Sequence, residues 1–203
     1  MWADIERVLV DRGRIAARVA ELGQQISADT ADAQPGVEPT LTIVPVLTGS
    51  VIFVADLIRC IPLRMRIKLI SVSSYPGQAT ASVGPDRLTA TLSALPEDLA
   101  GHHVLVIDDI LDSGHTLRFV RDAITARGPE SFRSCVLLRK QRDVAMATPV
   151  DYVAFDIPDA FVVGYGLDYD DEYRNLPEVC TLKPDVVASA STKASPQADG
   201  APA

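Results

Sequence analysis

The sequence has few cysteines and no long apolar run. Only Cys60, Cys135 and Cys180 occur among 203 residues, far apart and without a C-x-x-C pair. This pattern argues against a disulfide framework or a zinc site and favours free thiols in a reducing compartment. No stretch reaches the roughly 18 apolar residues of a membrane span. The N-terminus MWADIERVLV has acids where a signal peptide has bases. We therefore expect a cytoplasmic protein with no membrane partner.

The chain also lacks a basic excess and the common metal or nucleotide motifs. It has 19 Lys and Arg against 27 Asp and Glu, a net charge of -8, so no nucleic-acid partner is expected. No Walker A sequence, H-x-x-x-H pair or EF-hand loop occurs, which argues against an ATPase and against a metal cage built from protein alone. Its composition, 47% hydrophobic and 23% charged, is that of a globular domain.

Short apolar runs separated by polar turns predict most of the elements. We expect strands at 8–10, 41–47, 66–75, 88–93, 102–107, 131–138, 151–156 and 161–164. A helix capped by Asp11 should place Ile15, Val19, Leu22 and Ile26 on one face. A buried helix should span 51–61 before Pro62, and another should bury Leu117, Val120 and Ile124 and end near Gly128.

Strand, glycine-containing turn and helix follow one another twice, at 41–61 and at 103–127. Such alternation predicts an α/β fold with a largely parallel sheet, and ligands of such sheets bind beyond the carboxyl ends of the strands. Both turns should therefore lie at one edge of the sheet. We expect a single domain over 1–183, with a small, polar, mobile loop at about 74–86 and a disordered tail over 184–203.

The segment VLVIDDILDSGHTL (104–117) combines three acids with a turn suited to an anion. The turn DSGHT should leave backbone N–H groups unpaired at a helix N-terminus, where the helix dipole favours a phosphate. Asp108 and Asp109 would repel a bare phosphate, so they favour a ligand that also brings hydroxyl groups or a divalent cation, as ribose 5-phosphate does. The alternative is that Asp112 only caps the helix and that the acid pair is a solvated strand end.

This stretch resembles the phosphoribosyl-diphosphate signature of type I phosphoribosyltransferases: an apolar strand, two acids, two further residues, then D-[ST]-G-x-T. Four other segments are similar to hypoxanthine-guanine phosphoribosyltransferases: VLTGS (46–50), SSYPG (73–77), LLRK (137–140) and FVVGYGLDYDDEYRNLPEVCTL (161–182). The resemblance covers roughly residues 8–182. It implies the type I fold, a mostly parallel central sheet flanked by helices, with a small hood formed by the N- and C-terminal segments.

The resemblance also implies which residues bind phosphoribosyl diphosphate. The residues expected to hold the 5-phosphate are Ser113, Gly114, His115 and Thr116, while Asp108 and Asp109 face the ribose hydroxyls. The diphosphate is expected at the loop containing Thr48 and Gly49 and at Arg174, and Ser74 and Tyr75 begin the mobile loop. Relatives often have Lys or Arg where this chain has Thr48, and they have a cis peptide at the position of Leu47–Thr48.

The purine and the metal are assigned to a second set of residues. Asp112 is the expected general base and acid at purine N7, and Lys140 is expected to donate to the 6-oxo group. Phe161 would stack on the ring, the Val162 backbone would read its edge, and Asp168 would contact Mg²⁺. Taken singly, each has an ordinary alternative. Lys140 could be a surface charge, Phe161 a core residue, Asp168 a turn residue, and Arg174 a partner of Asp170 or Asp171.

The activity implied is transfer of a phosphoribosyl group from phosphoribosyl diphosphate to N9 of hypoxanthine or guanine. Mg²⁺ is the expected cofactor, and a homodimer or homotetramer is the expected assembly. Two alternatives stay open: a phosphoribosyltransferase that prefers xanthine, and a non-catalytic regulator that senses phosphoribosyl diphosphate. The second would need a basic nucleic-acid face or an extra domain, and this acidic chain indicates neither.

Overall fold

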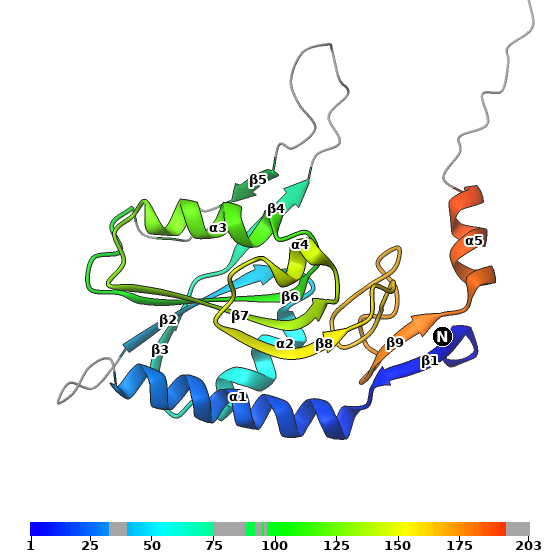
Figure 1. Cartoon of the computed structure of the whole chain (residues 1–203), viewed down its shortest axis with the longest axis horizontal. Coiled ribbons are helices and arrows are strands. Elements are labelled where there is room, and N and C mark those ends of the chain that lie inside the picture. Colours follow the sequence, from blue (N-terminus) through cyan, green and yellow to red (C-terminus); the bar gives the residue numbers. More distant parts are fainter. Residues whose placement is uncertain (33–39, 75–87, 92–94, 96, 194–203) are drawn as a thin grey trace, which may run out of the picture.

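The computed structural model describes residues 1–32, 40–74, 88–91, 95 and 97–193 (Figure 1). The strands are β1 (Ile5–Val10), β2 (Thr40–Leu47), β3 (Arg64–Ile67), β4 (Ile70–Ser74), β5 (Leu88–Thr91), β6 (His103–Leu111), β7 (Ser131–Lys140), β8 (Tyr152–Ile157) and β9 (Val179–Leu182). The α-helices are α1 (Arg12–Asp32), α2 (Val51–Leu57), α3 (His115–Thr125), α4 (Asp143–Met146) and α5 (Pro184–Lys193). Tyr75 and the rest of the predicted mobile loop lie outside the described residues, and Ser74 is the last residue of β4.

A seven-stranded sheet forms the centre of the molecule, in the order β5-β4-β2-β6-β7-β8 with β3 also paired to β2. Every pairing in it is parallel except that of β5 with β4. The predicted α/β class and the largely parallel sheet are therefore confirmed. The central strand β6 is buried along most of its length, as its continuous apolar sequence requires.

Helices cover both faces of this sheet, with α1 and α2 on one face and α3 on the other (Figure 1). Successive strand residues point to opposite faces. Leu105 and Ile107 accordingly pack in the cluster that contains α1 and α2, whereas Val104 and Val106 pack with α3. The expected apolar faces are confirmed, since these helix residues are all buried: Ile15, Val19, Leu22, Ile26, Leu117, Val120 and Ile124.

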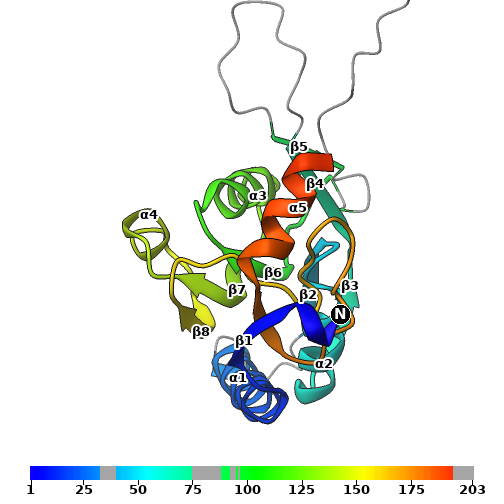
Figure 2. The same cartoon turned by 90° about the vertical axis from the view of Figure 1, so that its right-hand side faces the viewer.

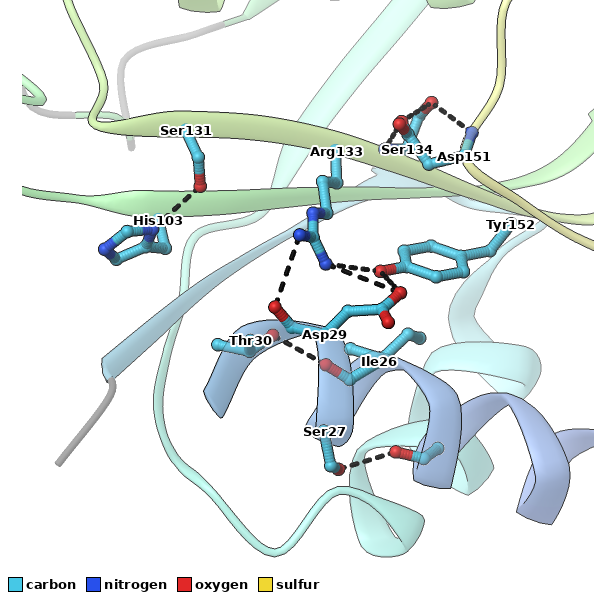
Figure 3. A network of polar contacts seen from close by, with 11 residues as sticks. Ile26, Ser27, Asp29, Thr30, His103, Ser131, Arg133, Ser134, Asp151 and Tyr152 are labelled. Carbon is cyan, nitrogen blue, oxygen red and sulfur yellow. Dashed lines mark hydrogen bonds and ion pairs between the residues drawn. The ribbon is translucent and has the colours of Figure 1, made fainter. Parts of the chain in front are cut away.

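Caps and a polar network fix the two ends of α1. At its start, Asp11 Oδ1 accepts hydrogen bonds from the backbone N–H groups of Gly13 and Arg14, the predicted cap. Near its other end, the Tyr152 hydroxyl on β8 donates to Asp29 and accepts from Arg133 on β7 (Figure 3). Burial, together with the hydrogen bond to Asp29, raises the pKa of Tyr152 to about 12, so the hydroxyl stays protonated and can donate.

The N-terminal segment and the segment before α5 meet in a second, smaller unit beside the main sheet, where β1 pairs antiparallel with β9 (Figure 2). An apolar cluster of its own underlies this pair, with Val163, Leu176 and Cys180 fully buried or nearly so. The predicted hood built from the N- and C-terminal segments is thus confirmed. All three cysteines are free, as expected. Within the described parts of the chain, no helix combines the length and apolarity that crossing a membrane requires.

The structure corrects three expectations about elements. Residues 66–75 are not one strand, because the chain breaks after Ile67 into β3 and β4, which pair with different parts of β2. Residues 161–164 make only isolated bridges, from Val163 to Cys180 and from Gly164 to Leu167, since Gly164 turns the chain with φ +94°. The expected tail contains a helix, α5, whose Val186 and Val187 pack against the hood. Residues 194–203 lie outside the described part.

The expected helix at 51–61 is confirmed in its first part. It is α-helical over Val51–Leu57 and continues as a 3₁₀ turn over Ile58–Cys60, immediately before Ile61 and Pro62. The position of the proline explains this end, because its ring cannot continue a helix.

Candidate active site

A cavity of about 350 Å³ opens where β2 and β6 end. One wall is the turn after β2, with Thr48 and Gly49. Another is the turn after β6 with the start of α3, which contribute Asp112, Ser113, Gly114, Thr116 and Leu117. The expectation that both turns lie at one edge of the sheet is confirmed. The Leu47–Thr48 peptide is cis, as the resemblance implied.

Asp108 and Asp109 form an acidic floor that packs against the first turn. A Cβ added to Gly49 would lie 1.6 Å from Asp109 Oδ2, so only glycine allows this approach. Burial raises the pKa of Asp108 well above its ordinary value, and the neighbouring Asp109 carboxylate adds repulsion. Burial also raises the pKa of Asp109. A ligand with hydroxyl donors or a cation would stabilise the ionised pair, whereas a bare anion would not.

The DSGHT turn depends on a glycine and is contacted by Arg118 and Thr148. Gly114 has φ +72°, and a Cβ there would meet Thr148 Oγ1 at 2.4 Å. Arg118 on α3 donates to the Ser113 carbonyl at 2.9 Å and to Thr148 Oγ1 at 3.3 Å. The Ser113 carbonyl is thereby paired with Arg118, and the N-terminus of α3 is the anion-accepting side of the turn.

Asp112 joins the phosphate turn to β7. Its Oδ2 accepts a hydrogen bond from Lys140 Nζ at 2.8 Å, and its Oδ1 accepts one from Arg142. Partial burial alone would raise the pKa of Asp112, but the hydrogen bonds from Lys140 and Arg142 outweigh it and hold the pKa below the ordinary value. The carboxylate is therefore ionised at neutral pH and able to accept a proton.

The segment between β8 and β9 closes the cavity from the hood side. Arg174 donates to the Gly166 carbonyl at 2.9 Å and pairs with Asp168 at 2.8 Å and with Asp171 at 3.2 Å. Gly166, with φ +105°, lies against the backbone of Gly49, since a Cβ there would be 2.1 Å from the Gly49 carbonyl oxygen. The loop that carries Asp168 and Arg174 is thus packed directly on the predicted diphosphate turn.

The residues expected at the purine differ in burial. Only 11% of the Lys140 side chain is exposed, so it is not a free surface charge. Phe161 is 50% exposed rather than a core residue, and its ring meets Tyr169 edge to face at 5.3 Å. Val162 beside it is buried. An exposed aromatic ring on a fixed backbone can stack on a planar ligand.

The structure brings most of the predicted site together. The cavity is lined by Thr48, Gly49, Asp108, Asp109, Asp112, Ser113, Gly114, Thr116, Asp168 and Arg174. Lys140 reaches this set through Asp112, while the side chain of His115 is exposed at the start of α3. Sequence reasoning missed two neighbours of these residues: Arg142, which pairs with Asp112, and Asp159, which lies 3.5 Å from Lys140 Nζ. Arg142 stands two residues after Lys140, but nothing in the sequence ties it to Asp112.

Comparisons with known proteins show the family of the chain. Residues 8–170 match the family model described as the phosphoribosyl transferase domain. The hypoxanthine-guanine phosphoribosyltransferase of Mycobacterium tuberculosis is 44% identical over 183 residues, covering 90% of this chain and 89% of that protein. The hypoxanthine phosphoribosyltransferase of Escherichia coli is 39% identical over 85% of this chain and 92% of its own.

A solved structure gives the same result. A variant of Trypanosoma cruzi hypoxanthine phosphoribosyltransferase, complexed with the product IMP, matches with a TM-score of 0.82 and 34% identity, covering 95% of this chain and 97% of that one. Both the fold and most of the length are therefore shared with these proteins. The chain belongs to the phosphoribosyltransferase family and has its type I fold.

Proposed function

We propose that the protein is a purine salvage enzyme. It transfers the 5-phosphoribosyl group of phosphoribosyl diphosphate to N9 of hypoxanthine or guanine and gives IMP or GMP and diphosphate. The single observation that carries this proposal is the position of Asp112. This carboxylate lies directly before the phosphate-accepting turn and at the same time contacts Lys140, so it touches both the sugar-phosphate half and the base half of the site. The names of the relatives support the same activity.

Each part of the cavity has one task in this proposal. The backbone N–H groups and hydroxyls of Ser113 to Thr116 hold the 5-phosphate, and Asp108 and Asp109 accept hydrogen bonds from the ribose hydroxyls. Thr48, Gly49 and Arg174 hold the diphosphate. Because Thr48 carries no charge, the guanidinium of Arg174 is the main protein cation at the leaving group.

The purine is oriented by a second group of residues. Lys140 donates to the 6-oxo group, Phe161 stacks on the ring, and the Val162 backbone reads its edge. Asp112 accepts the N7 proton as N9 becomes the nucleophile, and it returns this proton only when the reaction runs in reverse. Bond breaking at C1 of the ribose develops oxocarbenium character, as in glycoside chemistry, so bulk water has to be excluded from the site. The segment beginning with Ser74 and Tyr75 is proposed to cover the site during this step.

The acids of the cavity suit Mg²⁺ bound together with the substrate. Within the described residues, no three His, Cys, Asp or Glu side chains are grouped to hold a metal alone. Mg²⁺ commonly binds one or two carboxylates plus phosphate oxygens and waters. Asp168 lies in the cavity wall beside Arg174, with Asp108 and Asp109 on the floor, and these are the residues that would hold the ion. When bound, Mg²⁺ would neutralise the leaving diphosphate.

The protein is further proposed to act as one catalytic domain in the cytoplasm. The sheet supplies Asp108 and Asp109 to the cavity, and the segment between β8 and β9 supplies Asp168 and Arg174, so neither part makes the site alone. The homodimer or homotetramer remains a prediction.

Initial rates with four bases test the proposal. Hypoxanthine, guanine, xanthine and adenine are each supplied with phosphoribosyl diphosphate and Mg²⁺, and nucleotide formation is followed. Lys140 predicts turnover of the first two and rejection of adenine, which presents a 6-amino donor to a side chain that can only donate. A preference for xanthine would replace the proposed substrates, and binding of phosphoribosyl diphosphate without turnover of any base would indicate a sensor instead.

A further inference from the structure

Two cations and two anions close a ring at the base end of the cavity. Lys140 Nζ lies 2.8 Å from Asp112 Oδ2 and 3.5 Å from Asp159 Oδ1. Arg142 pairs with Asp112 Oδ1, and its Nε lies 3.4 Å from Asp159 Oδ2. The four side chains come from the turn after β6, the end of β7, the residue before α4 and the loop after β8. Charges of opposite sign therefore alternate around a closed circuit.

The proposed reaction requires one bond of this ring to be released. Both oxygens of Asp112 are occupied, one by Lys140 and one by Arg142, yet the carboxylate has to present an oxygen to the purine N7. Lys140 is also the proposed donor to the purine 6-oxo group. When Lys140 donates to the 6-oxo group of the base, its bond to Asp112 Oδ2 is released. Oδ2 can then turn to N7, while Oδ1 keeps its bond to Arg142.

Arginine suits the remaining bond better than lysine would. Its guanidinium stays charged and offers several N–H donors in a fixed planar fork. Here one end of the fork meets Asp112 and the Nε side faces Asp159, so the two acids hold the guanidinium between them. Lys140 is 11% exposed and Arg142 44% exposed, which leaves Lys140 as the cation facing inward.

We propose that Arg142 is a positioning residue for the transfer reaction, which holds Asp112 by Oδ1 so that Oδ2 is aimed at the purine once Lys140 binds the base. Asp159 holds Arg142 in that pose. This inference rests on the proposed function, because it assumes that Asp112 and Lys140 serve the base. Arg142 itself does not touch the base; it acts on the reaction through Asp112.

Variants at Arg142 and a matched neighbour test this role. Arg142→Gln removes the charge, and Arg142→Lys keeps it. Arg139→Gln is the control, because Arg139 also lies on β7 and forms an ion pair across to β8, with Asp156 at 2.7 Å, without touching Asp112. For each protein, kcat, the KM for hypoxanthine, the KM for phosphoribosyl diphosphate and the melting temperature are measured.

The hydrogen bond from Arg142 to Asp112 is charge-assisted, but solvent screens part of its strength at this half-exposed position. We therefore expect Arg142→Gln to lower kcat by about tenfold and no more. Arg142→Lys keeps the charge but lacks the planar fork, so it should recover part of kcat. The KM for phosphoribosyl diphosphate should not change, and Arg139→Gln should match the unaltered protein in kcat.

Three results would overturn the inference: an unchanged kcat in Arg142→Gln, an equal loss of kcat in Arg139→Gln, or a loss that Arg142→Lys does not recover in any part. The third result would mean that the retained charge is without effect. Failure of the proposed function itself looks different, since the unaltered protein would then form no nucleotide from any base.

Discussion

Replacing Lys140 by methionine should weaken the handling of 6-oxopurines without weakening the binding of phosphoribosyl diphosphate. Methionine keeps an unbranched apolar stem of similar length in a position that is only 11% exposed, so little packing is lost. What disappears is the ammonium group, which lies 2.8 Å from Asp112 and 3.5 Å from Asp159. Asp112 keeps its bond to Arg142 and stays an ionised acceptor.

The expected size of the effect follows from the lost hydrogen bond. A bond from a charged donor is worth about 1.5–3 kcal/mol, which corresponds to a loss of roughly 10- to 150-fold in kcat/KM for hypoxanthine. Lys140 meets the 5-phosphate turn at the Asp112 carboxylate, and that carboxylate keeps its bond to Arg142 in the variant, so the Kd for phosphoribosyl diphosphate should be unchanged.

Steady-state kinetics with hypoxanthine and calorimetric titration of phosphoribosyl diphosphate, done on the same preparations, separate the two effects. Arg139→Met serves as the control, because Arg139 is paired with Asp156 and not with the site. Equal weakening toward both ligands would mean that Lys140 is a general structural residue. No change in kcat/KM would remove it from the base site altogether.

Three further outcomes are expected. A chain that ends at Lys183 loses the packing of Val186 and Val187 on the hood and should melt roughly 3–8 °C lower; an unchanged melting temperature would mean that α5 contributes nothing. Mg²⁺ should bind the free protein weakly and bind far more tightly with phosphoribosyl diphosphate present, as calorimetry can show; tight binding to the free protein, or activity in excess chelator, would contradict this. Gly49→Ala should raise the KM for phosphoribosyl diphosphate sharply, because the new Cβ would lie 1.6 Å from Asp109 Oδ2; an unaltered KM would show that the turn can yield.

Local sequence predicted the strands and helices that carry the site, because each has a complete signal within a few residues. Asp11 stands before the periodic apolar face of α1, and the continuous apolar run of β6 ends in its acid pair. The break between β3 and β4 has no such signal. Their apolar pattern reads as continuous, and the break appears only in how β2 pairs with each of them.

The helix α5 shows a second limit of sequence reasoning. Its segment has few large residues, so composition indicated a disordered tail. Val186 and Val187 nevertheless pack on the apolar cluster of the hood, a contact that the local sequence does not indicate. The Tyr169 hydroxyl also donates to the Val187 carbonyl at 2.9 Å. Packing against a distant segment thus outweighs weak local preference.

The same limit explains the residues that were missed in the site. Asp112 could be recognised from its neighbours in the DSGHT turn. Arg142 could not, because its relation to Asp112 spans 30 positions and depends on β6 and β7 lying side by side. Asp159 joins them only because the loop after β8 returns to the same edge.

The most direct test of the account is the turnover of Asp112→Asn with hypoxanthine and phosphoribosyl diphosphate, measured beside its affinity for the latter. Asparagine keeps the size of the side chain but cannot accept the N7 proton. We predict that kcat falls by about 10²–10⁴-fold while the Kd for phosphoribosyl diphosphate stays unchanged. An unaltered kcat would contradict the account and would leave Asp112 as no more than a residue that positions the turn before α3.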